Sequence, residues 1–104
     1  MNADLRAALE EGDAGRALAL IEALPAAERQ AYAVAGHEAD LLGKLGRHQE
    51  ELVILRRLIA TGPPEPSLHL SVAHALKRLG RRDEAVAAVR EALAIAPSYG
   101  KAWW

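Results

Sequence analysis

The sequence predicts an all-α protein. Three observations lead to this fold class: a composition rich in Ala and Leu, apolar residues at helical spacings, and glycines that recur with a 34-residue period. Apolar residues make up 51% of the 104 residues and charged residues 26%, proportions typical of a folded, water-soluble domain. Phe and Cys are absent, so the core must come from Leu, Ile, Val and Ala, and neither a disulfide nor a thiolate metal site can form.

Three glycines mark an internal repeat, because Gly12, Gly46 and Gly80 lie at equal intervals along the chain. Apolar residues recur at fixed offsets from these glycines, with the spacings of three, four and seven that one face of a helix produces. The recurring columns are Leu5/Ala39/Ala73, Ala8/Leu42/Leu76, Ala17/Glu51/Ala85, Leu18/Leu52/Val86, Ile21/Leu55/Val89 and Leu24/Leu58/Ala92. From these columns we expect a core that includes Leu52, Leu55, Leu58, Leu76, Val86 and Val89.

Each unit is expected to form a helix, a glycine turn, a second helix and a break. A glycine in the left-handed conformation can end the first helix, and Asp13 can cap the second. Prolines in LPAAE, TGPPEPS and APSYG then stop the second helices. The expected helices span residues 3–11, 14–24, 26–45, 48–60, 66–79 and 82–95, in units of residues 1–31, 32–65 and 66–99. Residues 100–104 are interpreted as the start of a fourth unit that is cut off.

The 34-residue helix–turn–helix period resembles the tetratricopeptide repeat (TPR) family. The family's signature positions in the third unit fall on His69, Val72, Ala73, Leu76, Ala85, Val89 and Pro97. Two departures are Glu51, where a small residue is usual at the crossing of the helices, and Arg29, where a proline is usual. The resemblance implies a right-handed superhelical array of antiparallel helix hairpins, with Ala17 and Ala85 at close crossings. It also implies a protein–protein interaction or scaffold module without catalytic activity.

The same resemblance implies a concave groove lined by the first helix of each unit. The family's groove positions fall on Arg6, Glu10, Asp40, Lys44, Leu70, His74, Lys77 and Arg78. Of these, Lys44, His74, Lys77 and Arg78 are expected to form a positive stretch. The expected partner is therefore a protein or peptide, with an acidic peptide as the specific hypothesis.

The last residues carry a narrower resemblance. Trp103 lies one full repeat period after His69, on the family's tryptophan position. The segment LHLSVAHALKRLGRRDEAVAAVREALAIAPSYGKAWW is similar to the repeat segment before the catalytic domain of bacterial TPR sulfotransferases. The alternative function is therefore the non-catalytic N-terminal arm of such an enzyme, with its active site downstream of Trp104. Two exposed tryptophans would also favour self-association of this chain, or packing onto the helix at 82–95.

The charged residues are unevenly distributed. Residues 1–40 hold eight acids and three bases, whereas residues 41–104 hold six acids and ten bases. The net charge of −1 gives no general attraction to nucleic acid. The one basic cluster, KRLGRR, has no interleaved aromatics and is interpreted as a solvated turn or as part of a groove for acidic peptides.

Catalytic and targeting motifs are not found in the sequence. GKLGR lacks the features of a phosphate-binding loop, and His69 and His74 would lie about 140° apart on a helix, too far around it to share a metal. We therefore expect no catalytic, cofactor or metal site. The acidic N-terminus does not resemble a signal peptide, and no apolar run is long enough to span a membrane. A cytoplasmic location is the simplest expectation.

Overall fold

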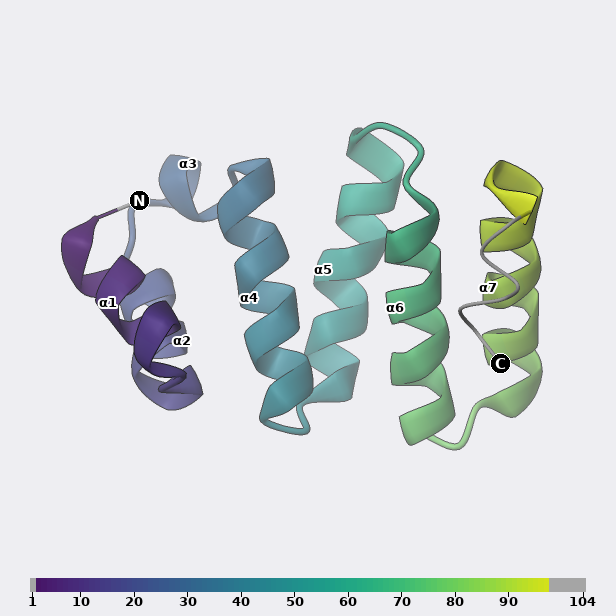
Figure 1. Cartoon of the computed structure of the whole chain (residues 1–104), viewed down its shortest axis with the longest axis horizontal. Coiled ribbons are helices and arrows are strands. Elements are labelled where there is room, and N and C mark those ends of the chain that lie inside the picture. The colour runs from purple at the N-terminus through teal and green to yellow at the C-terminus, as the bar shows by residue number, and fades with distance from the viewer. Residues whose placement is uncertain (1, 98–104) are drawn as a thin grey trace.

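Residues 2–97 are described by the computed structural model, and they form seven α-helices (Figure 1). The helices are α1 (Ala3–Glu11), α2 (Ala14–Glu22), α3 (Ala26–Arg29), α4 (Tyr32–Lys44), α5 (His48–Thr61), α6 (Pro66–Arg78) and α7 (Arg82–Ile95). No strand occurs in this range, so the prediction of an all-α protein is confirmed. None of these helices has the length and apolar character needed to cross a lipid bilayer.

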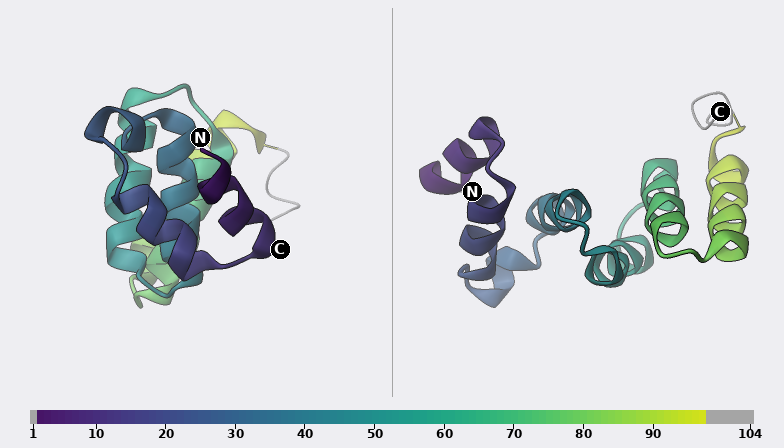
Figure 2. Two further views of the ribbon diagram at one scale, coloured as in Figure 1. Left: turned by 90° about the vertical axis from the view of Figure 1, so that its left-hand side faces the viewer. Right: turned by 90° about the horizontal axis from the view of Figure 1, so that it is seen from below.

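The helices form a row in chain order, with α1 at one end and α7 at the other (Figure 1). Paired helices contact each other in three hairpins, α1–α2, α4–α5 and α6–α7. Successive hairpins are joined by contacts of α2 with α4 and of α5 with α6. Viewed from below, α4 and α6 are displaced to one side of α5 (Figure 2). We call the side on which α4 and α6 project the A side, and the opposite side, toward which α5 is displaced, the B side (Figure 2).

The glycine turns repeat the same backbone geometry in every unit. Gly12, Gly46 and Gly80 have φ angles of 73°, 77° and 78°, in the left-handed region that favours glycine. The residue after each glycine donates its amide to a carbonyl of the preceding helix, and each glycine amide also bonds back, as in a Schellman motif. These bonds join Asp13 to Ala8 (3.1 Å), Arg47 to Leu42 (2.8 Å) and Arg81 to Leu76 (2.8 Å). The second helices then begin at residues 14, 48 and 82, so the period of the sequence is also a period of the backbone.

The core lies between successive helices and follows the recurring columns. Leu5, Ile21, Leu52 and Leu76 are the largest fully buried side chains. Five of the six expected core residues are buried, but Val86 is 46% exposed, so its assignment to the core is wrong. A following helix packs beside α2 and beside α5, whereas no further helix follows α7 within residues 2–97.

One predicted helix is divided in the structure. The segment 26–45 forms α3 and α4, with Gln30 and Ala31 between them, and α2 ends at Glu22 instead of residue 24. The break allows Arg29 to reach Glu38, because Arg29 Nε and Nη2 each donate to a carboxylate oxygen at 3.0 Å. In an unbroken helix these two residues would be about 13 Å apart along the axis and could not pair.

The middle hairpin accommodates Glu51 at the column where Ala17 and Ala85 are buried. Gly43 on α4 makes this possible, since a Cβ atom there would lie 2.7 Å from Glu51 Oε2. The carboxylate of Glu51 also contacts His48, with 3.0 Å between Nδ1 and Oε1. The space that the Glu51 side chain on α5 needs is thus provided by Gly43 on α4, which has no side chain.

Candidate binding grooves

The A-side groove is a depression of about 330 Å³ between α4, the start of α5 and α6. Its lining residues are Asp40, Gly43, Lys44, His48, Glu51, Ser71, His74, Ala75 and Arg78. Four of the eight groove residues expected from the sequence are brought together here, namely Asp40, Lys44, His74 and Arg78. They come from the last turns of α4 and the second half of α6.

The charges of the A-side groove are mixed in sign. Lys44 Nζ forms an ion pair with Asp40 at 3.1 Å, four residues earlier on α4. Glu51 adds a second carboxylate that is paired with His48. Arg78 forms no ion pair with any residue in the range 2–97, so it is the cation of this groove most available to a ligand.

The remaining predicted groove residues lie elsewhere. Arg6 and Glu10 are on α1 and Lys77 is exposed on α6, but none of the three lines the A-side groove. Leu70 is half-buried and packs against the core. The proposed self-association residues, Trp103 and Trp104, lie outside the described residues.

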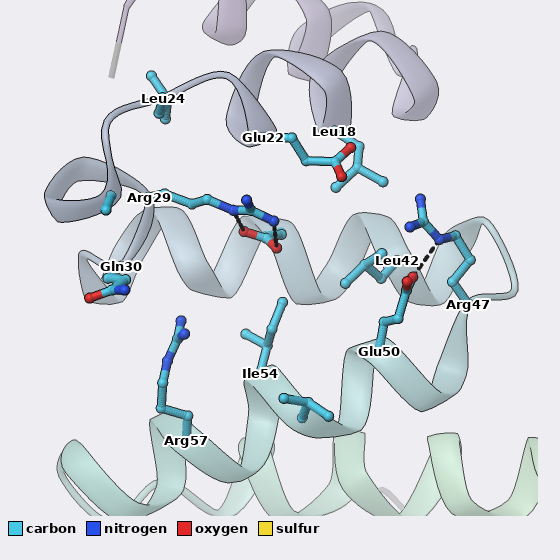
Figure 3. Close-up of a pocket in the computed structure, with 13 residues that line it drawn as sticks. Leu18, Glu22, Leu24, Arg29, Gln30, Leu42, Arg47, Glu50, Ile54 and Arg57 are labelled. Atoms are coloured by element: carbon cyan, nitrogen blue, oxygen red, sulfur yellow. Dashed lines mark hydrogen bonds and ion pairs between the residues drawn. The ribbon is translucent and has the colours of Figure 1, made fainter.

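The first B-side groove is a depression of about 530 Å³ between α2, α3, α4 and α5 (Figure 3). Its lining residues are Leu18, Glu22, Leu24, Ala26, Arg29, Gln30, Glu38, Leu42, Arg47, Glu50, Val53, Ile54 and Arg57. Sequence reasoning did not identify this groove. The available signal was Glu38, a carboxylate in the first helix of its unit where the next unit has Val72.

Buried charge distinguishes the first B-side groove. Glu38 is only 5% exposed, and its two oxygens accept the paired bonds from Arg29. The hydrogen bond that Arg29 donates to Glu38 raises the pKa of Arg29 above its usual value, so the guanidinium stays charged. Arg47 pairs with Glu50 at the other end and lowers the pKa of that carboxyl. Arg57 is in no ion pair among residues 2–97.

The second B-side groove lies between α5, α6 and α7 and has a volume of about 290 Å³. It is lined by Arg56, Ile59, His69, Val72, Leu76, Glu84, Ala87, Ala88 and Glu91. Seven of these nine residues lie one repeat period after a lining residue of the first B-side groove, so the two grooves are equivalent places in successive units. Here His69 Nδ1 contacts Glu91 Oε2 at 3.1 Å and links α6 to α7.

The chemistry that these grooves offer is ion pairing, hydrogen bonding and apolar contact. Among the described residues, no three His, Cys, Asp or Glu side chains are grouped so that they could hold a metal ion. No protein-family model, curated protein or solved structure matches the chain.

Proposed function

We propose that this chain is a protein-interaction module of the tetratricopeptide-repeat type, which binds a protein or peptide segment on its A side. The observation that carries this proposal is the regular recurrence, from unit to unit, of the turn geometry and of the second-helix starts. Stacked hairpins of a fixed period form extended surfaces, on which successive first helices place their side chains in register.

In the sequence, one repeat period also relates six polar residues of the first helices in two columns. Arg6, Asp40 and His74 form one column, and Glu10, Lys44 and Arg78 form the other, each with one residue per unit. The signs alternate between the first two units, whereas the third unit has no acid in either column. We infer that an acidic part of the ligand contacts Arg78, close to the C-terminal end of α6.

The test is the binding of fluorescein-labelled oligo-glutamate and oligo-lysine peptides at two salt concentrations. The acidic peptide should bind more tightly, and its affinity should fall as salt rises. Arg78→Gln should weaken that binding. Arg90→Gln is the matched control, because Arg90 is exposed on α7 and lines none of the three grooves.

The proposal fails if the two peptides bind with equal affinity or if salt has no effect. It also fails if Arg78→Gln and Arg90→Gln weaken binding equally, because the acidic peptide would then respond only to the net charge of the chain.

A further inference from the structure

We propose that the first B-side groove is a second, separate binding site, for a peptide segment with an aliphatic side chain next to a carboxylate. This site goes beyond the A-side function, since it uses the opposite face of α4. Glu38 and Leu42 line the B-side groove, whereas Asp40 and Lys44 line the A-side groove. A step of two residues turns a side chain about 200° around a helix, so the two grooves cannot share a ligand side chain.

The floor of the first B-side groove is apolar and suits an aliphatic side chain. Leu18 and Leu42 are each 3% exposed and Ile54 is 8% exposed. Val53 lies among the lining residues with 65% of its surface exposed, so it can be covered by a ligand. The volume of about 530 Å³ lies in the range of pockets that hold small ligands or a few side chains.

The groove is open because the first unit is built from shorter helices. α2 has 9 residues, whereas α5, its counterpart in the next unit, has 14. The chain then leaves α2 and returns through α3, so that Leu24 and Gln30 line one end of the groove (Figure 3). A peptide side chain can enter where the missing turns of α2 would otherwise lie.

The electrostatics of the groove leave one cation for a carboxylate. Arg29 is held by Glu38, and Arg47 by Glu50, so both guanidinium groups are already neutralised. Arg57 has no such partner in the described part of the chain. Figure 3 shows it one turn from Ile54 on α5 and reaching toward Gln30. A peptide whose aliphatic side chain contacts Ile54 would therefore place its adjacent carboxylate next to Arg57.

The second B-side groove has an equivalent backbone but places its charges at different positions. Glu91 occupies the position that corresponds to Arg57, and it would repel a carboxylate. Arg56 occupies the position that corresponds to Glu22, so the two exposed charges are reversed in sign between the grooves. The same peptide should therefore discriminate between two grooves of one molecule.

Amide NMR titration of the whole chain with a capped synthetic peptide, in which leucine precedes glutamate, tests the proposal. The expected shifts lie on residues that line the first B-side groove, and the same peptide with glutamine in place of glutamate should bind more weakly. Arg57→Gln should reduce the affinity about tenfold, the typical effect of losing a hydrogen bond to a charged group. Arg56→Gln is the control, since the adjacent arginine loses the same charge but lines the other groove.

Three results would overturn this site. One is an equal loss of affinity for Arg56→Gln and Arg57→Gln, which would mean attraction to net charge alone. Another is the absence of shifts in the first B-side groove at millimolar peptide. The last is a set of shifts confined to the lining of the A-side groove, with sensitivity to Arg78→Gln and not to Arg57→Gln. That last result would support the A-side function while removing this one.

Discussion

The two B-side grooves show how far a common backbone period determines a surface. Both grooves are framed by two second helices and the first helix between them, and Leu42 and Leu76 lie at the same position in each. Yet one groove has a volume of about 530 Å³ and the other about 290 Å³. The buried carboxylate of Glu38 in the first is replaced by Val72 in the second.

The difference shows that framework and chemistry are set by different residues. The glycine turns and the apolar columns place the helices, and these are repeated from unit to unit. The length of the second helix changes between the first unit and the others, and Glu22, Glu38 and Arg57 of the first groove are replaced by Arg56, Val72 and Glu91 in the second. A repeat protein of this kind can therefore vary its recognition chemistry one unit at a time while its core stays the same.

The largest expected effect is on the shared framework. Leu42→Ala and Leu76→Ala should each lower the free energy of unfolding by about 2–5 kcal/mol, because both side chains are almost fully buried and would leave cavities. Urea unfolding of both variants measures this. Losses below about 0.5 kcal/mol at both positions would show that the columns do not form the core. A large loss at only one would show that the two grooves are not equivalent.

A smaller effect is expected from the charge that distinguishes the grooves. Glu38→Ala should cost about 1–3 kcal/mol, because two hydrogen bonds to Arg29 and buried contacts are lost, although Arg29 can be solvated. Glu38→Val copies Val72 of the second groove and should cost less than Glu38→Ala, since valine restores buried apolar contacts while the partly exposed Arg29 is hydrated in both variants. Chemical unfolding compares the two. An equal loss for both variants would mean that Glu38 is indispensable and that the grooves do not share one framework.

The fold class and most helix bounds could be predicted from the sequence because they depend on local signals. Gly12, Gly46 and Gly80 mark the turns, and the apolar spacing marks the buried faces. The break before Tyr32 could not be predicted, because neither Gln30 nor Ala31 is a residue type that ends helices. The break is accompanied by a tertiary contact between Arg29 and Glu38. Such a contact cannot be inferred from local sequence signals.

The candidate grooves were predictable only in part, for a similar reason. The alignment of first helices identified Asp40, Lys44, His74 and Arg78, because the repeat period places them on one side. The first B-side groove depends on where α2 ends and on which pairs form across helices, and neither follows from a single unit. Val86 was assigned to the core because its column is buried in the other units, whereas burial depends on the neighbour that packs against it.

The smallest expected effects concern the ion pairs at the rims of the two grooves. Arg47 lowers the pKa of Glu50, and Arg81 lowers the pKa of Glu84, each through a hydrogen bond to the carboxylate. Since the folded pKa lies below the ordinary value of 4.5, each pair stabilises the fold above that pH. The contribution is lost as the pH falls through the folded pKa. Both pairs are exposed, so the change in melting temperature should be slight.

A carbon-13 NMR titration of the glutamate carboxyls separates the two pairs. Arg47→Gln should raise the pKa of Glu50 and leave that of Glu84 unchanged, and Arg81→Gln should do the reverse. Arg56→Gln should also raise the pKa of Glu84, because the charge of Arg56 acts on Glu84 in the second groove. The pKa of Glu50 should not change in Arg56→Gln, since the partner of Glu50 is Arg47, the N-cap residue of α5. If Arg56→Gln shifted both carboxyls equally, the two grooves would be one continuous electrostatic surface and not two distinct sites.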